Sequence, residues 1–190
     1  MLEQVLENVD KAGTRLKIVT NLPYQISAAF LHTLVEYRKR IERAVVMLQR
    51  EVGLRIVASA GDEEYSSFSL YLQAHLDTQW IADVPRHAFF PAPKVQSAVL
   101  RLKPGGTEAG ADPRVFAVYL ELVERVFKHR RKQLSNAVRL AYSHLTQEQV
   151  DALLSAAGVD ATLRPQDVSG ETYMQIARKL DEELSAGEKR

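Results

Sequence analysis

Along the first hundred residues, short apolar segments typical of strands alternate with segments whose apolar residues recur at helical spacing. Residues 16–20 (LKIVT) and 44–48 (AVVML) are short, apolar and β-branched, which predicts two strands. Between them, residues 25–38 place apolar side chains at helical spacing. Residues 51–59 and 67–76 are further helical segments, separated by Gly61 and a polar loop at 63–67. Strands that alternate with helices predict an α/β sheet.

Two more strands close this part of the chain. Residues 78–84 and 95–102 are predicted strands, and the segment 85–93 between them contains three prolines and two phenylalanines. So many prolines exclude regular structure from the connection. The connection is also too short for a crossover helix, so the two strands are predicted to pair antiparallel.

The pattern changes after Lys103. A glycine-rich linker spans residues 104–110, and Asp112 followed by Pro113 is typical of a helix start. Helical stripes then cover residues 115–126, 134–141, 146–157 and 170–184, and residues 185–190 are expected to fray. We therefore predict two domains, an α/β domain over 1–104 and an all-helical domain over 112–190.

Composition and charge narrow the class of protein. The 190 residues include no cysteine, which excludes disulfides and thiolate zinc sites. The N-terminus has no signal-peptide pattern, and no apolar run reaches the ~18 residues of a membrane span. The five histidines show no metal-ligand spacing, so no metal is expected. These features predict a cytoplasmic protein without a membrane partner, and we expect a monomer.

The turn that follows the first strand, Asn21-Leu22-Pro23-Tyr24, carries candidate chemistry. In open α/β sheets, ligands bind beyond the carboxyl ends of strands. The Asn21 side-chain oxygen and the Leu22 carbonyl are two acceptors beside a stiff proline, and Tyr24 is a flat stacking surface. Two acceptors suit a planar amine such as N6 of adenine, which donates two hydrogens. The alternative is an ordinary turn in which Asn21 caps the next helix.

Several segments, in this order, resemble the KsgA/Dim-type ribosomal RNA adenine N6-dimethyltransferases, with a related likeness to Erm-type enzymes. NLPY followed by QIS is similar to the fourth motif of that family. The other matching segments are MLQREVGLRI at 47–56, the loop with Tyr65 and Ser66, VPRHAFFPAPKVQSAVLRL at 84–102, FKHRRKQLSNAV at 127–138 and RPQDVS at 164–169. The resemblance implies a partial Rossmann-like class I methyltransferase sheet followed by a small helical domain.

The resemblance also implies roles for single residues. Asn21 and the Leu22 carbonyl would bind the amine, while Tyr24 and Phe89 would stack on the two faces of an extruded adenine. Phe89 could instead be a core aromatic residue. Pro23 would aim the Leu22 carbonyl, Pro91, Pro93 and Lys94 would hold the shape of the Phe89 loop, and Phe90 is assigned no role. Gln49, Glu51 and Arg55 match a family pattern that we interpret as a fold-stabilising polar network.

Basic residues cluster between Arg125 and Arg139, a stretch with six lysines or arginines and no acid. Helical spacing places Lys132 and Arg139 about 20° apart, which predicts a basic face on a packed helix. Such a face attracts RNA phosphates, although it could also be an ordinary solvated surface. The predicted RNA contacts are Lys94, Lys128, Arg130, Arg131, Lys132 and Arg139. Arg164, before Pro165, is interpreted as a helix-capping feature.

The resemblance implies S-adenosylmethionine as methyl donor. In the family a glycine-rich turn and an acid after the first two strands hold this donor, and neither is found upstream of Asn21, so that Asn21 alone would remain of its site. We expect a fragment that lacks about three β-α units and is poorly stable alone. The implied function is small-subunit ribosomal RNA adenine N6-dimethylation. The alternative is a short, non-catalytic ribosomal RNA-binding or ribosome-assembly module, and a transcription factor on the same fold has no support in the sequence.

Overall fold

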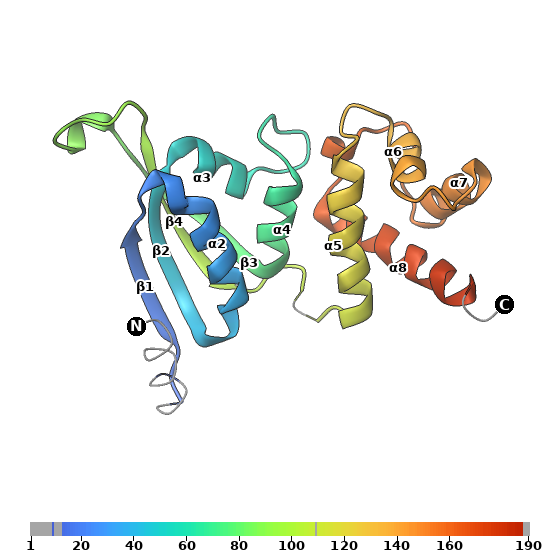
Figure 1. The fold of residues 1–190 in the computed structure, drawn as a ribbon, viewed down its shortest axis with the longest axis horizontal. Coiled ribbons are helices and arrows are strands. Elements are labelled where there is room, and N and C mark those ends of the chain that lie inside the picture. The colour runs from blue at the N-terminus through green and yellow to red at the C-terminus, as the bar shows by residue number, and fades with distance from the viewer. Residues whose placement is uncertain (1–8, 10–12, 109, 188–190) are drawn as a thin grey trace. The chain divides into compact units, whose positions relative to one another are not determined.

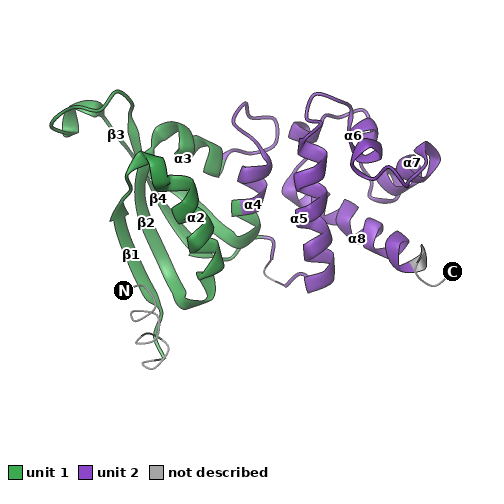
Figure 2. Cartoon of the chain, in the orientation of Figure 1, with its two compact units in different colours: residues 1–57, 72–106 green, residues 58–71, 107–190 purple. Residues whose placement is uncertain are grey.

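A computed structural model describes residue 9, residues 13–108 and residues 110–187. The chain divides into two compact units, residues 1–57 with 72–106, and residues 58–71 with 107–190 (Figure 2). The predicted domain boundary lies at the same linker, but the prediction placed residues 58–71 in the first domain. The structure groups these residues with the helices because the buried Tyr65 ring packs edge-on against Phe127, with ring centroids 6.0 Å apart.

The first unit contains a four-stranded mixed sheet with the strand order β1-β2-β4-β3 (Figure 1). The strands are β1 (Leu16–Asn21), β2 (Ile41–Gln49), β3 (Leu76–Val84) and β4 (Ser97–Pro104). β1 pairs parallel with β2, while β4 runs antiparallel to both β2 and β3. The predicted α/β class and the predicted antiparallel closing pair are therefore confirmed.

Alternation along the central strands creates one strongly buried face. Ala44, Val46 and Leu48 of β2 are buried, and their register partners on β4 are Leu102, Leu100 and Ala98. Helix α2 (Ser27–Glu36) and helix α3 (Arg50–Val57) lie over this sheet (Figure 1). Successive side chains of each strand therefore point alternately toward the helices and away from them.

Two local predictions in the first unit need correction. The helix expected over residues 25–38 is a 3-10 turn, η1 (Tyr24–Ile26), followed by the shorter α2 and a second turn, η2 (Arg38–Arg40). The turn arises because the Ile26 N–H donates to the Pro23 carbonyl at 3.1 Å, which tightens the first residues. The segment after Pro85, expected to be irregular throughout, forms the 3-10 turn η3 (Arg86–Ala88). Pro85 can stand before that turn because the first residues of a helical turn need no N–H donor.

The second unit is helical wherever residues 110–187 form regular structure. Its elements are α5 (Pro113–Phe127), α6 (Leu134–Ala141), α7 (Gln147–Ala156), the turn η4 (Pro165–Asp167) and α8 (Gly170–Gly187). Asp112 caps α5 as expected, since its carboxylate accepts from the Arg114 N–H at 2.8 Å. α4 (Ser67–His75) runs from this unit into the first. The predicted fraying of residues 185–187 is not seen, because α8 continues to Gly187, and residues 188–190 lie outside the described residues.

Buried tyrosines organise the core of the helical unit. Tyr65, Tyr119 and Tyr173 are at most 2% exposed. The Tyr65 hydroxyl donates to the Val168 carbonyl at 3.1 Å, and the Tyr173 hydroxyl donates to the Pro165 carbonyl at 2.9 Å. Burial, which penalises the charged phenolate, raises the pKa of all three hydroxyls above the ordinary value near 10. Since Phe127 contacts both Tyr65 and Tyr173, this cluster anchors the end of α5.

This core predicts alkaline unfolding. Because the folded-state pKa values are raised, the stabilisation is fully present below pH ~10 and is lost as the pH rises further, since only the unfolded chain releases the protons. Each tyrosine then costs about 1.4 kcal/mol per pH unit. Urea unfolding between pH 8 and pH 11 measures the slope. Tyr65→Phe should give a shallower slope than wild type, and equal slopes would contradict the assignment.

Candidate functional site

The end of β1 is fixed by its last hydrogen bond to β2. The Leu22 N–H donates to the Met47 carbonyl at 2.9 Å, and Asn21 is the register partner of Met47. Pro23 follows with φ −57° and ψ 131°, and the 3-10 turn η1 begins at the next residue, Tyr24. The chain therefore leaves the sheet immediately after Leu22 and turns into η1.

A pocket of about 430 Å³ opens beside this turn. It is lined by Asn21, Leu22, Pro23, Tyr24, Gln25, Phe89, Phe90, Pro91 and Pro93. The structure thus brings the predicted turn and the predicted Phe89 loop together, although they are far apart in the sequence. The same loop extends beyond the end of the sheet between β3 and β4 (Figure 1).

Asn21 is exposed at the pocket. Within the described part of the chain, its side chain makes no hydrogen bond, and η1 and α2 have no side-chain cap. The capping role considered for Asn21 is therefore not seen. Asn21 and Leu22, which carry a side-chain and a backbone acceptor oxygen, line a pocket whose other residues are largely apolar or aromatic.

Tyr24 is held in place by the antiparallel strand β4. Its hydroxyl lies 3.0 Å from the Ser97 Oγ, and Ser97 is buried at the first position of β4. This bond joins the turn after β1 to the strand that begins after the Phe89 loop. The ring is consequently oriented by two separate segments.

The Phe89 loop is shaped by its backbone. The Phe89 N–H donates to the Arg86 carbonyl at 3.2 Å, and Arg86 Nη1 donates to the Lys94 carbonyl at 3.0 Å, which closes the base of the loop. Phe89 is only partly buried and lines the pocket, unlike a core aromatic residue. Sequence reasoning missed Phe90 and Gln25, which also line the pocket. The signal for Phe90 was present, because an apolar ring between prolines in a loop has no strand in which to be buried.

Together these groups can accept two hydrogen bonds from one flat molecule. Two oxygens on a fixed turn suit a planar group with two donor hydrogens, and the adjacent rings offer stacking surfaces.

No three histidine, aspartate or glutamate side chains in the described ranges come together in a way that could hold a metal ion. In the same ranges, no helix is both long and apolar enough to cross a membrane.

The basic cluster is arranged differently from the prediction. α5 ends at Phe127 and α6 begins at Leu134, so Lys132 and Arg139 do not share a helical face. Residues 128–132 form a series of turns, in which the Lys132 N–H donates to the His129 carbonyl at 2.8 Å. The helix dipole favours cations at the carboxyl end of α5. The start of α6 is fixed separately, by the hydrogen bond from the Leu134 N–H to the Leu163 carbonyl.

The basic residues differ in how far they are engaged by neighbouring acids. Lys128 pairs with Glu124 at 3.1 Å and Arg125 pairs with Glu121 at 2.9 Å. Among the described residues, the exposed predicted RNA contacts that pair with no acid are Arg130, Arg131, Lys132 and Arg139 in the second unit and Lys94 in the first. We call Arg130, Arg131 and Lys132 the basic turn.

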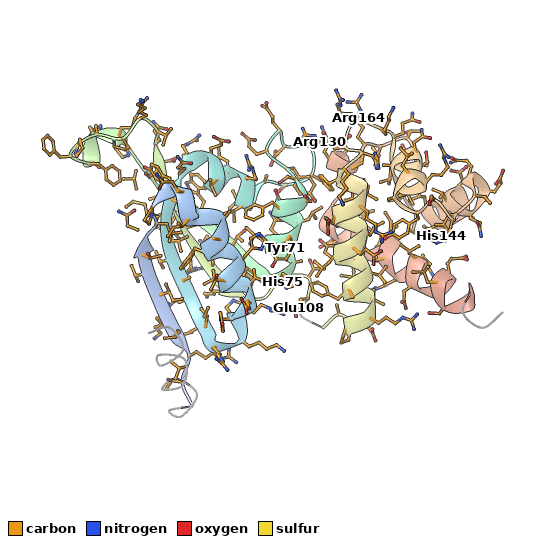
Figure 3. All side chains as sticks on the ribbon, in the orientation of Figure 1. Tyr71, His75, Glu108, Arg130, His144 and Arg164 are labelled. Atoms are coloured by element: carbon orange, nitrogen blue, oxygen red, sulfur yellow. The ribbon has the colours of Figure 1, made fainter. Side chains whose placement is uncertain are left out.

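A backbone hydrogen bond places Arg164 close to the basic turn. The Leu134 N–H donates to the Leu163 carbonyl at 2.6 Å, which brings the residue before Arg164 to the end of that turn. Arg130 and Arg164 both project from the same end of this unit (Figure 3). The capping interpretation also holds, since the Arg164 N–H donates to Asp167 at 3.2 Å. The exposed guanidinium of Arg164 adds a cation to this surface that the sequence interpretation left out.

The polar network expected around residue 51 is smaller than predicted. Arg55 pairs with Glu51 at 3.2 Å on the surface of α3, with side-chain exposures of 44% and 78%. Gln49 takes no part in it among the described residues. An exposed pair of this kind adds little to stability.

Comparisons with known proteins agree with this architecture. A sequence model of the family described as ribosomal RNA adenine dimethylase matches residues 2–182. The chain is similar to ribosomal RNA small subunit methyltransferase A of Dechloromonas aromatica, with 39% identity over 88% of this chain and 63% of the relative. The protein of the same name from Shewanella sediminis is 37% identical over 87% of this chain and 59% of the relative. The chain therefore spans about three-fifths of the length of these curated relatives.

Two solved structures share the fold. A dimethyladenosine transferase from Plasmodium falciparum superposes with a TM-score of 0.74 at 21% identity, covering 88% of this chain and 67% of that one. The 23S rRNA methyltransferase ErmE superposes with a TM-score of 0.68 at 23% identity, covering 88% and 66%. Both support the partial Rossmann-like methyltransferase sheet and helical part that the sequence predicted.

The Tyr24–Ser97 bond predicts a measurable coupling. Ser97→Ala should lower the free energy of unfolding by about 1 kcal/mol, because the half-buried Tyr24 hydroxyl loses its partner. A double-mutant cycle with Tyr24→Phe, followed by urea unfolding, should give a coupling energy of about 0.5 kcal/mol or more. Ser143→Ala, at an exposed position of the other unit, is the control. Strict additivity of Ser97→Ala and Tyr24→Phe would refute the bond.

Proposed function

Because the chain belongs to the ribosomal RNA adenine dimethylase family, we propose that the Asn21–Tyr24 turn and Phe89 bind the target adenine of small-subunit ribosomal RNA for methylation at N6. The observation that carries this proposal is the pocket that Asn21, Leu22, Tyr24 and Phe89 line together. An adenine inside a duplex cannot reach such a pocket, so the base would be extruded from its stack.

The residues of the turn would act through fixed dipoles. Asn21 Oδ1 and the Leu22 carbonyl oxygen would each accept one hydrogen of the N6 amine. This favours a more tetrahedral nitrogen, whose lone pair is less delocalised into the ring and is directed toward the methyl group. Positioning and preorganised acceptors then supply the rate enhancement, without a strong general base. Tyr24 and Phe89 would hold the base by stacking on its faces, and Pro23 would aim the Leu22 carbonyl.

When bound, S-adenosylmethionine would supply the methyl group from its sulfonium: the N6–C bond would form as the S–C bond breaks to leave a neutral thioether, and the amine would release one proton to solvent. Of the residues described, Asn21 is the one that we propose to face the donor. No described glycine lines the pocket, so the close backbone approach of a glycine-rich turn is not offered there. The described residues therefore do not account for donor binding by themselves, and methyl transfer is proposed for the whole protein.

The basic turn would dock the ribosomal RNA through its phosphates. Arg130, Arg131, Lys132 and Arg139 are exposed, and Arg164 extends the same positive region. Lys94, beside the pocket loop, would contact phosphate near the target base, and Lys128 would contribute less because it is paired with Glu124. With ribosomal RNA as partner, we propose that the protein acts as a monomer in the cytoplasm, where small subunits are assembled.

A second candidate is a non-catalytic ribosomal RNA-binding or ribosome-assembly module. The exposed cations of the basic turn favour it, because they would bind RNA whether or not the pocket holds adenine. The two candidates differ in one respect. Only the first requires that binding depend on an adenine amine and on Asn21.

Adenine-dependent binding tests the first candidate. The probes are a fluorescein-labelled nine-nucleotide RNA with one central adenosine among uridines, and a twin with purine riboside, which lacks the N6 amine. We expect anisotropy titrations to show about five- to tenfold tighter binding of the adenosine RNA, since two hydrogen bonds are at stake. Asn21→Ala should remove the preference, and Gln79→Ala, an exposed amide of β3, should keep it. Equal affinities of wild type for both RNAs would favour the non-catalytic module.

The basic turn predicts a change in salt dependence. Replacing Arg130, Arg131 and Lys132 together by alanine should weaken binding to a small-subunit RNA fragment and reduce the slope of log K against log salt by about 2. The residues are exposed, so the thermal unfolding midpoint should stay unchanged. Lys179→Ala, which removes a cation paired with Glu182 at 2.9 Å, is the matched control. An unchanged slope in the triple variant would show that RNA docks elsewhere.

A further inference from the structure

Phe90 is the most exposed large hydrophobic residue in the described part of the chain. Its relative exposure is 102%, compared with 83% for Val19 and 49% for Ile26 and Ile81. Single exposed hydrophobic residues are common on protein surfaces and need no role by themselves. Phe90 differs from the other exposed large hydrophobics because it lines the pocket beside Asn21 and Phe89.

The backbone holds the Phe90 ring at the pocket rim. Pro91 and Pro93 restrict the chain after it, and the turn before it is closed by the Ala88 N–H bond to the Pro85 carbonyl at 3.0 Å. The Arg86 bond to the Lys94 carbonyl joins the two ends of the loop at 3.0 Å. The backbone that carries the ring needs little ordering when a ligand arrives, which lowers the entropy cost of stacking.

The charge of the loop indicates what kind of ligand approaches the ring. Residues 85–96 contain Arg86, His87 and Lys94 and no acidic residue. A polyanion therefore fits this surface better than an apolar peptide does. RNA supplies both parts of the match, phosphates for the cations and bases for the ring.

We propose that Phe90 stacks on the nucleobase next to the extruded adenine. This inference rests on the proposed function, and it names Phe90 as a positioning residue for that same site. When an adenine leaves its stack, the neighbouring base loses a stacking partner. The Phe90 ring, on the rim of the pocket that receives the adenine, would replace that partner. It would thereby fix the flanking nucleotide and the depth to which the adenine enters.

Photochemical cross-linking of the full chain tests the contact directly. Two nine-nucleotide RNAs carry a central adenosine with 5-iodouridine on its 5′ or its 3′ side, and the cross-linked residue is identified by mass spectrometry. We expect residue 90 to be the cross-linked position with one of the two RNAs. Cross-links that form only at other residues with both RNAs would overturn the inference.

Affinity measurements separate stacking from apolar bulk. Phe90→Ala should bind the adenosine RNA about five- to tenfold more weakly than wild type, and Phe90→Trp should match or exceed wild type. Phe90→Leu, which keeps the bulk without a π face, should resemble the alanine variant. Ile81→Ala, on β3 outside the pocket, is the control. Unaltered RNA affinity of Phe90→Ala would overturn the inference.

Failure of this inference is distinguishable from failure of the proposed function. If wild type and Phe90→Ala both prefer adenosine over purine riboside with equal affinities, only the role of Phe90 is refuted. If wild type shows no such preference, the adenine pocket itself is refuted, and the Phe90 inference falls with it. Because the ring is exposed, circular dichroism melting should show the same stability for wild type and all variants of Phe90.

Discussion

One backbone hydrogen bond determines the geometry of the pocket. The Leu22 N–H donates to the Met47 carbonyl at 2.9 Å and ends the parallel pairing of β1 with β2. Pro23 has a restricted φ and is followed at once by η1, so the chain leaves the ladder there. The Asn21 side chain and the Leu22 carbonyl therefore remain at the end of the sheet as acceptors on a fixed turn. Without this rung, the two oxygens would have no defined spacing relative to the aromatic rings.

The second side of the pocket depends on the antiparallel pair β3–β4. Its long connection carries Phe89 and Phe90 beyond the sheet, and the return strand begins at Ser97, which bonds Tyr24 at 3.0 Å. The turn after the parallel strand thus supplies the acceptors and the Tyr24 ring, and the connection of the antiparallel pair supplies Phe89 and Phe90. A mixed sheet brings both to one end. This arrangement suits the planar base of the proposed function, which would be bound at its edge and supported on its faces.

In the proposed function the helical unit would have a separate role, which is to hold RNA by its phosphates while one base occupies the pocket. The tyrosine core anchors Phe127, and the cations of the basic turn follow shortly after it in the chain. Exposed cations on a turn are less constrained than cations on a helical face, so in the proposed function they would adapt to a curved phosphate backbone. The Leu134–Leu163 bond adds Arg164 to the same positive region.

The sequence by itself determined the strand and helix order, the antiparallel closing pair, the Asp112 cap, the family and the residues of the NLPY turn, because these depend on local periodicity, proline and short motifs. It did not determine the grouping of residues 58–71 with the helices, which depends on the long-range packing of Tyr65 against Phe127. Helical spacing misplaced Lys132 and Arg139 because it assumes a continuous helix, whereas tertiary hydrogen bonds to residues 161 and 163 start α6 only at Leu134. The meeting of Asn21 with Phe89 and Phe90 was likewise decided by the sheet, since residues nearly seventy positions apart become neighbours only through strand pairing.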